Sequence, residues 1–128
     1  MAIQRFGSGI VWEEAVGYSR AVRAGPFVFV AGTTAVDADG VVRAPGDAYE
    51  QTVFALDGVE HALHRAGARL EQVVQTRMFV TDMTRAQEVG RAHADRFAGI
   101  RPVTAMVEVA ALMDPRMVVE VEALAYLG

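Results

Sequence analysis

The last third of the chain, residues 101–126, constrains the fold more than any other stretch. It contains two apolar runs, Thr104–Val109 and Met117–Ala125, and the second alternates apolar side chains with Glu120 and Glu122. Because side chains along a strand alternate between two faces, both glutamates lie on one face of the predicted strand. On a face open to water they form an ordinary solvated pair. In a crevice their repulsion raises one pKa, which makes a candidate proton-transfer group.

The preceding residues predict further strands and two helices. An opening strand at Ile3–Gly9 leads into a polar, irregular stretch around Trp12, Glu13 and Glu14. Alternating or apolar runs next to glycine and proline predict a β-hairpin, and apolar residues repeated every three or four positions predict helices. These elements are the hairpin Gly17–Ala24 and Phe27–Ala31, the helix Ala48–Ala66, the strand Val73–Val80 and the helix Arg85–Phe97.

The order of the main elements, ββαβαββ, predicts an α+β fold with both helices on one face of a sheet. The length of 128 residues, without a repeat or linker, predicts one domain over residues 1–128. Strands such as Phe27–Ala31 are apolar on both sides, while two helices can cover only one face. We therefore expect self-association to cover the other face.

Composition excludes several kinds of chemistry. The chain contains no cysteine, so disulfides, thiolate metal sites and cysteine nucleophiles are excluded. All 12 basic residues are arginine and asparagine is absent, which removes lysine Schiff bases and one common oxyanion donor. A net charge of −4, with arginines spread singly along the chain, argues against a nucleic-acid partner. The apolar runs are too short to span a membrane and the N-terminus lacks a signal-peptide pattern, so the cytoplasm is the expected compartment.

Three histidines and one tyrosine–arginine pair are the remaining polar candidates. His61 and His64 fall opposite the apolar stripe of the first helix without a third ligand nearby, so we expect a solvated surface and no metal site. His93 lies on the inner side of the second helix and is expected to be a hydrogen-bonded packing residue. Tyr18 and Arg20 share one face of their predicted strand. They either bind a carboxylate or form an interface tyrosine beside a surface arginine.

Four segments are informative when taken together. They are GYSRAVRAGPFVFVAGTTAVD, the helix from Tyr49 to Gly67, VVQTRMFVTDM, and RPVTAMVEVAALMDPRMVVEVEALA. In order and spacing, and over nearly the full chain, they resemble the RidA/YjgF family of reactive-intermediate (enamine/imine) deaminases. The resemblance implies a chorismate-mutase-like subunit with a mixed sheet, assembled as a homotrimer whose sheets pack inward and whose ligand pockets lie between subunits. It also implies hydrolysis of 2-aminoacrylate-type enamines and imines to 2-oxo acids and ammonia, without a cofactor.

The resemblance also assigns pocket positions. Tyr18 matches the pocket tyrosine, Glu120 the glutamate that holds the attacking water, and Gly32 the glycine after the pocket serine. Because the carboxylate-binding arginine is replaced by an uncharged residue, we expect 2-aminoacrylate-type substrates to be turned over poorly; losing one partner of a buried charge pair costs about 2–5 kcal/mol. The departures are Ala31 for the serine, Gly90 for an asparagine, Thr104 for that arginine and Met106 for a cysteine.

Arg20 is the candidate for a replacement charge. On a regular strand it points with Tyr18 into the crevice, where it clamps an acid group of the ligand or pairs with Glu120 and lowers its pKa. A bulge would instead turn Arg20 out to solvent. Three functions stay open: an imine or enamine hydrolase, a non-catalytic trimer that binds a small metabolite, and an endoribonuclease, against which the acidic net charge counts.

Overall fold

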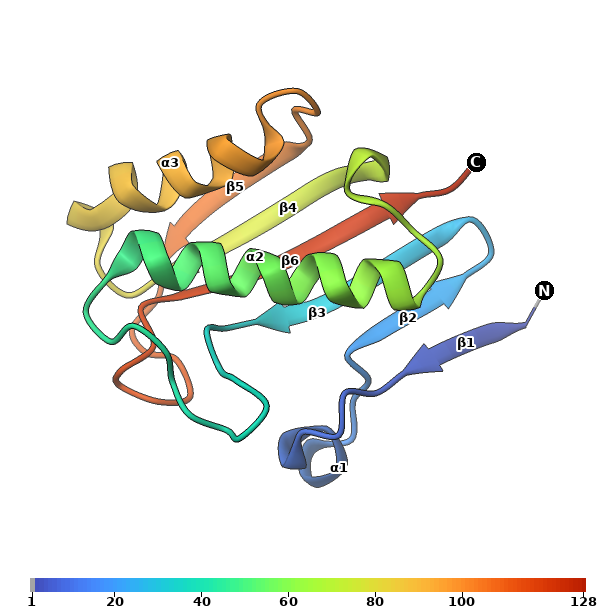
Figure 1. Ribbon diagram of the computed structural model, residues 1–128, viewed down its shortest axis with the longest axis horizontal. Coiled ribbons are helices and arrows are strands. Elements are labelled where there is room, and N and C mark those ends of the chain that lie inside the picture. Colours follow the sequence, from blue (N-terminus) through green and yellow to red (C-terminus); the bar gives the residue numbers. More distant parts are fainter. Residues whose placement is uncertain (1) are drawn as a thin grey trace.

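The structure is a computed structural model, and it describes residues 2–128. These residues form a six-stranded sheet, three α-helices and two short 3-10 helices (Figure 1). The strands are β1 (Ile3–Phe6), β2 (Ala21–Ala24), β3 (Phe27–Thr33), β4 (Val73–Val80), β5 (Val103–Glu108) and β6 (Val119–Tyr126). The helices are α1 (Val11–Val16), α2 (Ala48–Arg65) and α3 (Ala86–Phe97), with 3-10 turns at Leu70–Gln72 and Met83–Arg85. The predicted α+β class is confirmed.

The C-terminal strand β6 lies inside the sheet, whose order is β1-β2-β3-β6-β4-β5. Strands β4 and β5 run parallel and all other neighbours are antiparallel, so the sheet is mixed. Alternation along β6 buries Val119 and Val121 in the core and leaves Glu120 and Glu122 half-buried on the opposite face. The register places Glu122 opposite Arg77. The sequence pattern therefore predicted the two faces of this strand correctly.

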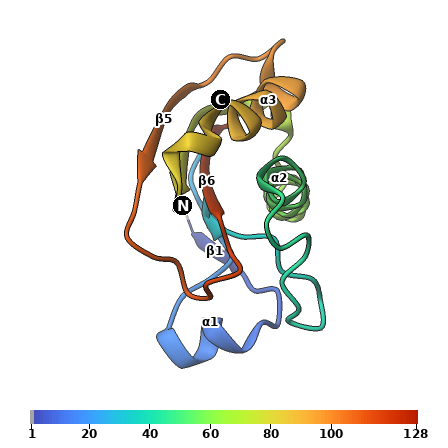
Figure 2. The ribbon, with the colours of Figure 1, turned by 90° about the vertical axis from the view of Figure 1, so that its left-hand side faces the viewer.

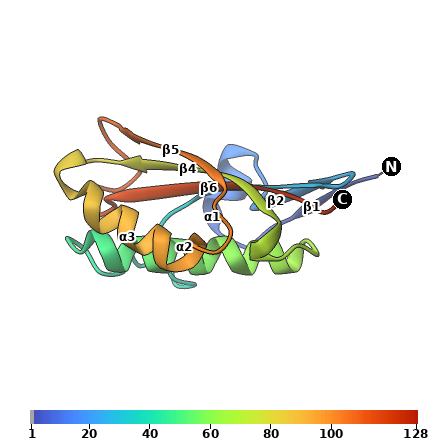
Figure 3. The same ribbon diagram turned by 90° about the horizontal axis from the view of Figure 1, so that it is seen from above.

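Helices α2 and α3 lie side by side on one face of the sheet (Figures 1 and 3). The side chain of Asp47 caps α2 by accepting a hydrogen bond from the Glu50 amide at 3.0 Å. Beyond its other end lies Gly67, whose φ of +87° favours glycine. The helix predicted for this stretch is confirmed, because its periodic stripe is buried in the core. The buried residues of the stripe are Ala48, Thr52, Ala55, Leu56, Val59 and Leu63.

The buried amide side chain of Gln51 on α2 holds two loops in place. The Gln51 side chain is fully buried, and its Nε2 donates to the carbonyl oxygens of Arg43 at 3.1 Å and Arg116 at 2.8 Å. Its Oε1 accepts a hydrogen bond from the Val118 amide at 2.9 Å. Because both amide hydrogens and the carbonyl have partners, Gln51 holds the loop before α2 and the loop before β6 against the helix.

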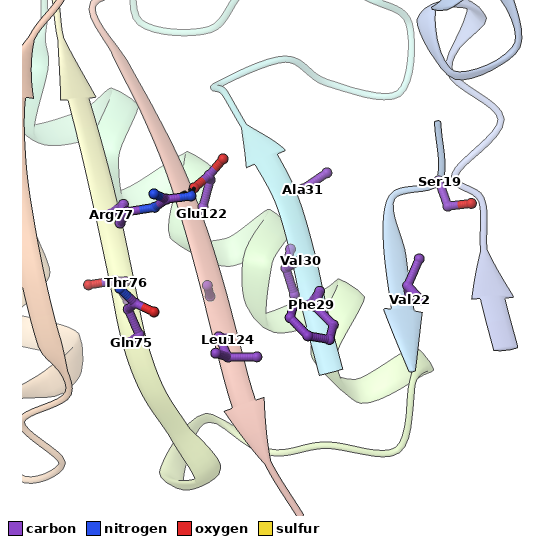
Figure 4. A pocket seen from close by; sticks show the side chains of 11 residues that line it. Ser19, Val22, Phe29, Val30, Ala31, Gln75, Thr76, Arg77, Glu122 and Leu124 are labelled. Atoms are coloured by element: carbon purple, nitrogen blue, oxygen red, sulfur yellow. Dashed lines mark hydrogen bonds and ion pairs between the residues drawn. The ribbon is translucent and has the colours of Figure 1, made fainter. Parts of the chain in front are cut away.

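The opposite face of the sheet carries no helix within residues 2–128 (Figures 2 and 3). A hollow of about 340 Å³ lies on this face, lined by Phe29, Leu124 and the Arg77–Glu122 ion pair of 2.7 Å (Figure 4). The prediction that two helices leave one sheet face uncovered is therefore confirmed. Large apolar side chains exposed on this face are Phe27, Phe29, Val103, Val107 and Tyr126.

The N-terminal segment differs from the prediction. Residues 11–16 form α1, which lies beyond the end of the sheet (Figure 2), where we expected an irregular stretch. Strand β2 begins only at Ala21, because the amides of Gly17 and Tyr18 bond the carbonyl of Glu13 at the end of α1 and so cannot join the sheet. No buried apolar stripe marks this short helix, which is why the periodicity missed it. The ends of β1, β3, β5 and β6 differ from the predicted ends by about one to three residues.

Candidate functional site

A cavity of about 320 Å³ lies at the C-terminal end of β3, between α1 and α2. Four of the residues predicted to form the pocket line it: Tyr18, Arg20, Gly32 and Glu120. Most of the remaining wall is apolar. Its apolar side chains are Ile10, Trp12, Val16, Val36, Phe54, Ala62, Met113 and Met117. A largely apolar wall with a few convergent polar groups is the usual composition of a small-molecule site.

Gly32 gives the Glu120 carboxylate its place in the cavity. The pairing of β3 with β6 is irregular between Val30 and Thr33, and Gly32 lies within this irregularity, next to Glu120. A Cβ atom built on Gly32 would lie 1.9 Å from Glu120 Oε2 and 2.8 Å from its Cδ. Glycine is therefore required here by the close approach of the carboxylate, because any side chain would occupy the same space.

Burial raises the pKa of Glu120 above its usual value, and the negative charge of Glu122 on the same strand face raises it further. The charge of Arg20 opposes both effects without overcoming them. Glu120 lies in a cavity, as one of the two readings of the glutamate pair required, but Glu122 lines the hollow on the open face and pairs with Arg77. Burial is therefore the main cause of the raised pKa of Glu120. Arg20 lowers this pKa, as expected, but the net shift is upward, because the carboxylate that pairs with Arg20 is Glu13.

Arg20 is held by a fork of hydrogen bonds and lines the cavity, so the orientation toward solvent that a bulge would give does not occur. Its Nη1 donates to the carbonyl oxygen of Gly32 at 2.8 Å and to Thr33 Oγ1 at 2.9 Å. Its Nη2 donates to the Tyr18 hydroxyl at 3.3 Å. The guanidinium carbon also lies 5.6 Å from the centroid of the Tyr18 ring, within cation–π range. Arg20 therefore joins the segment before β2 to the end of β3.

Glu13, on α1, supplies the counter-charge of the site. Its Oε2 lies 3.7 Å from Arg20 Nε, and its carboxylate accepts hydrogen bonds from the amide and the hydroxyl of Ser8. Burial acts to raise the pKa of Glu13, but the Ser8 hydrogen bonds and the charge of Arg20 lower it below the usual value. An ionised Glu13 neutralises Arg20. Among the residues 2–128 that line the cavity, Glu120 is therefore a carboxylate without an ion-pair partner.

The other residues singled out from the sequence lie elsewhere. Ala31 faces the hollow on the open sheet face and not the cavity (Figure 4). Thr104 and Met106 lie on β5, and Gly90 lies on α3. Because β6 and β4 separate β3 from the edge strand β5, one chain does not bring these residues to the cavity. The predicted pocket is therefore divided into two sets at different places on the protomer.

The histidines lie as the sequence predicted. His61 and His64 are exposed on α2, although His61 also borders the cavity. His93 is buried on the inner side of α3, and its Nε2 lies 2.8 Å from Thr76 Oγ1. Within residues 2–128, no group of three or more histidine, aspartate or glutamate side chains is placed to hold a metal ion, and no helix has the length and apolar character to cross a membrane.

Sequence reasoning missed the contribution of α1 and α2 to the site. Trp12 and Glu13 were assigned to an irregular stretch, and Phe54 was not singled out. One signal was available: Ser8 and Glu13 are spaced so that a carboxylate can bond the backbone before a short helix. The remaining contacts are long-range and carry no local pattern.

The mixed sheet under two helices, with a glutamate-bearing cavity at the C-terminal end of β3, defines the class of small α+β proteins with a YjgF-type fold. The solved structure of Rv2704 from Mycobacterium tuberculosis, described as a member of the highly conserved YjgF/YER057c/UK114 family, has a TM-score of 0.88 and 52% identity over 98% of this chain and 99% of that one. YyfA from Yersinia pestis, described as belonging to the conserved Rid protein family, has a TM-score of 0.85 and 27% identity over 98% and 99% of the two chains.

Sequence relatives agree with these structures. The family model described as Endoribonuclease L-PSP matches residues 12–127. An uncharacterized protein of Streptomyces coelicolor is 42% identical over 127 residues, which are 99% of this chain and 94% of that protein. A RutC family protein of Pyrococcus abyssi is 31% identical over 85% of each chain. The chain belongs to the YjgF/RidA family, to which the Endoribonuclease L-PSP model corresponds.

Proposed function

We propose that the protein hydrolyses the C=N bond of a small imine, or of the imine tautomer of an enamine, with Glu120 and a water molecule as the reacting pair. The observation that carries the proposal is Glu120: a half-buried carboxylate of raised pKa that lines a largely apolar cavity beside Tyr18 and Arg20. A carboxyl group with a pKa nearer to neutral is a better general acid and base at physiological pH than an ordinary one. The resemblance to the enamine/imine deaminases supports the same class of reaction.

In the proposed reaction, the water oxygen attacks the imine carbon while Glu120 takes a proton from the water and passes it to the nitrogen. The C=N bond becomes a single bond, and the product of this step is an amino alcohol. Glu120 then takes the hydroxyl proton and passes it to the nitrogen, so that the C–N bond breaks, the carbonyl forms and ammonia leaves. One imine and one water thus give one carbonyl compound and one ammonia.

We also propose that residues 1–128 act as one domain that assembles as a homotrimer. Two observations support this assembly: the open sheet face exposes large apolar side chains, and the two sets of pocket residues lie apart on one protomer. In the trimer, the Glu120 cavity of one protomer would face the Gly90–Thr104–Met106 region of the next. Light scattering at micromolar concentration should give about three times the mass of one chain. A stable monomer would contradict both the assembly and the shared pocket.

The substrate we propose lacks a carboxylate at the Thr104 position. Thr104 is uncharged, and Arg20 already donates to Gly32, Thr33 and Tyr18 and is neutralised by Glu13 within the protomer. Because the missing charge pair is worth about 2–5 kcal/mol, 2-aminoacrylate-type substrates should react roughly 30- to 5,000-fold more slowly than with a family member that has the arginine. An apolar substituent fits the wall formed by Trp12 and Phe54.

Ammonia release from freshly generated imines tests the proposal. A panel of imines, made in the assay by an amine oxidase or an amino-acid oxidase, should include at least one whose hydrolysis the protein accelerates. Glu120→Gln should lose this acceleration. The matched control Glu71→Gln, at an exposed site that does not line the cavity, should keep it. If no imine of the panel reacts, or if Glu120→Gln is fully active, Glu120 is not the reacting base.

A second function, binding of a small metabolite without catalysis, is favoured by the loss of charge at Thr104. It uses the same cavity and the same trimer, and it predicts ligand retention by the purified trimer without ammonia release. The endoribonuclease activity named in the family description is less well supported, because the net charge is −4 and several arginines are paired with acids within the protomer.

A further inference from the structure

The imidazole of His93 and the hydroxyl groups of Thr76 and Thr104 form a chain of contacts that runs from the core to the edge of the sheet. His93 on α3 is 8% exposed, and Thr76 on β4 is fully buried. Their side chains lie 2.8 Å apart (Nε2 to Oγ1), and Thr76 Oγ1 donates to Thr104 Oγ1 on β5, also at 2.8 Å. Thr104 is exposed. The first two groups need each other because a buried polar group without a partner costs about 1–3 kcal/mol. The second contact, from Thr76 to Thr104, extends the chain to the surface.

The number of hydrogens couples the two contacts. A threonine hydroxyl has one hydrogen, so Thr76 donates either to Thr104 or to His93, and not to both. With the Thr76 hydrogen on Thr104, the contact between Thr76 and His93 uses a hydrogen on His93 Nε2. The hydrogen of Thr104 is then free to point outward, and Thr104 presents a neutral donor at the edge of the sheet.

The surroundings of Thr104 disfavour a charged partner. Strand alternation places Met106 and Glu108 on the same side of β5 as Thr104, and the charged one of these two residues is negative. Burial lowers the pKa of His93, which keeps the inner end of the chain uncharged at neutral pH. Gly90, one turn before His93 on α3, leaves open space, since a Cβ atom built there would touch nothing within 4 Å. A small acceptor group without charge fits this environment.

We propose that His93, through Thr76, orients the Thr104 hydroxyl so that it donates to an uncharged oxygen of the ligand, such as an amide or ketone carbonyl. Thr104 is the group that touches the ligand, and Thr76 and His93 are positioning residues. That this oxygen belongs to the substrate rests on the proposed function, in which β5 faces the Glu120 cavity of the next protomer. The direction of the hydrogen-bond chain does not rest on it.

Nitrogen NMR of the His93 ring tests the direction of the chain. At neutral pH the ¹⁵N shifts should show a neutral ring protonated on Nε2, with the three histidines assigned by single His→Gln variants. A ring protonated on Nδ1 would mean that Thr76 donates inward, and the proposal would be wrong. This measurement needs no ligand, so it stands whatever happens to the proposed reaction.

Binding of two probes, pyruvamide and pyruvate, tests the class of ligand. Wild-type protein should bind uncharged pyruvamide more tightly than pyruvate. Thr76→Val should weaken pyruvamide binding about 3- to 10-fold, the share of one neutral hydrogen bond, without changing pyruvate binding, while Thr76→Ser should retain the wild-type value. His93→Gln, which keeps a donor, should resemble wild type, and His93→Leu should resemble Thr76→Val. Thermal melts must show each variant folded.

Three results would overturn the inference: binding of neither probe, binding of pyruvate at least as tight as that of pyruvamide, or equal pyruvamide binding by wild type and Thr76→Val. Its failure and the failure of the proposed function are distinguishable. Ammonia release that depends on Glu120, found together with a His93 ring protonated on Nδ1, would remove this inference alone. A ring protonated on Nε2 with selective pyruvamide binding, but without ammonia release from any imine, would remove the hydrolysis alone.

Discussion

The substitution Gly32→Ala tests whether the position of the Glu120 carboxylate is what the site depends on. The new Cβ atom would lie 1.9 Å from Glu120 Oε2, whereas contacts shorter than 3.0 Å essentially never occur. The carboxylate must therefore move by about 1 Å or rotate away. Gly32 does not have a positive φ, so alanine fits its backbone without strain, and Glu120 is the group that has to move. The cost in stability should be small, because the atoms that must move belong to the free end of the Glu120 side chain, which lines a cavity.

A displacement of about 1 Å at a reacting group lowers a rate by roughly 100-fold. We expect this loss in kcat for ammonia release by Gly32→Ala, measured with whichever imine the wild type hydrolyses. Gly99→Ala is the matched control, since its Cβ atom meets nothing within 4 Å and its φ is not positive. The control should keep wild-type activity. Full activity of Gly32→Ala, with a crystal structure that shows Glu120 unmoved, would refute the argument from close approach.

Three further predictions concern stability. Burial raises the pKa of Glu120 above 4.5, so the folded state holds this proton more tightly than the unfolded chain, and the contribution of Glu120 to stability falls as the pH rises from 4.5. Urea unfolding at pH 4 and pH 7 should therefore show wild type losing stability relative to Glu120→Gln between the two pH values. Burial lowers the pKa of His93 below 6.5, so stability should fall as the pH drops below 6.5, and His93→Gln should lack that part of the fall. Gln51→Leu removes one amide that serves three backbone groups, and urea unfolding should show a loss of about 2–4 kcal/mol; a loss below about 1 kcal/mol would mean that water replaces these bonds.

Part of the candidate site could be predicted from local pattern and resemblance. Alternation along the last strand placed Glu120 and Glu122 on one face, and Tyr18, Arg20 and Gly32 line the same cavity as Glu120. The partner of Arg20 could not be predicted, because Glu13 is on a short helix without a periodic stripe and meets Arg20 only when the chain folds back. For the same reason the sign of the Glu120 pKa shift was open: it depends on which carboxylate neutralises Arg20.

The sequence by itself determined the elements whose signal is local. Periodicity in residues 48–66 and 85–97 and the apolar runs of the strands follow from burial of one side of each element, and this pattern does not depend on what covers it. Only the tertiary structure decided the strand order, which leaves two strands between β3 and β5 and so separates Thr104 from the cavity that Glu120 lines. It also decided the contacts of Thr76 with His93 and with Thr104, three side chains that come from three elements. Such contacts depend on how the chain returns through the sheet, and no short stretch of sequence records that path.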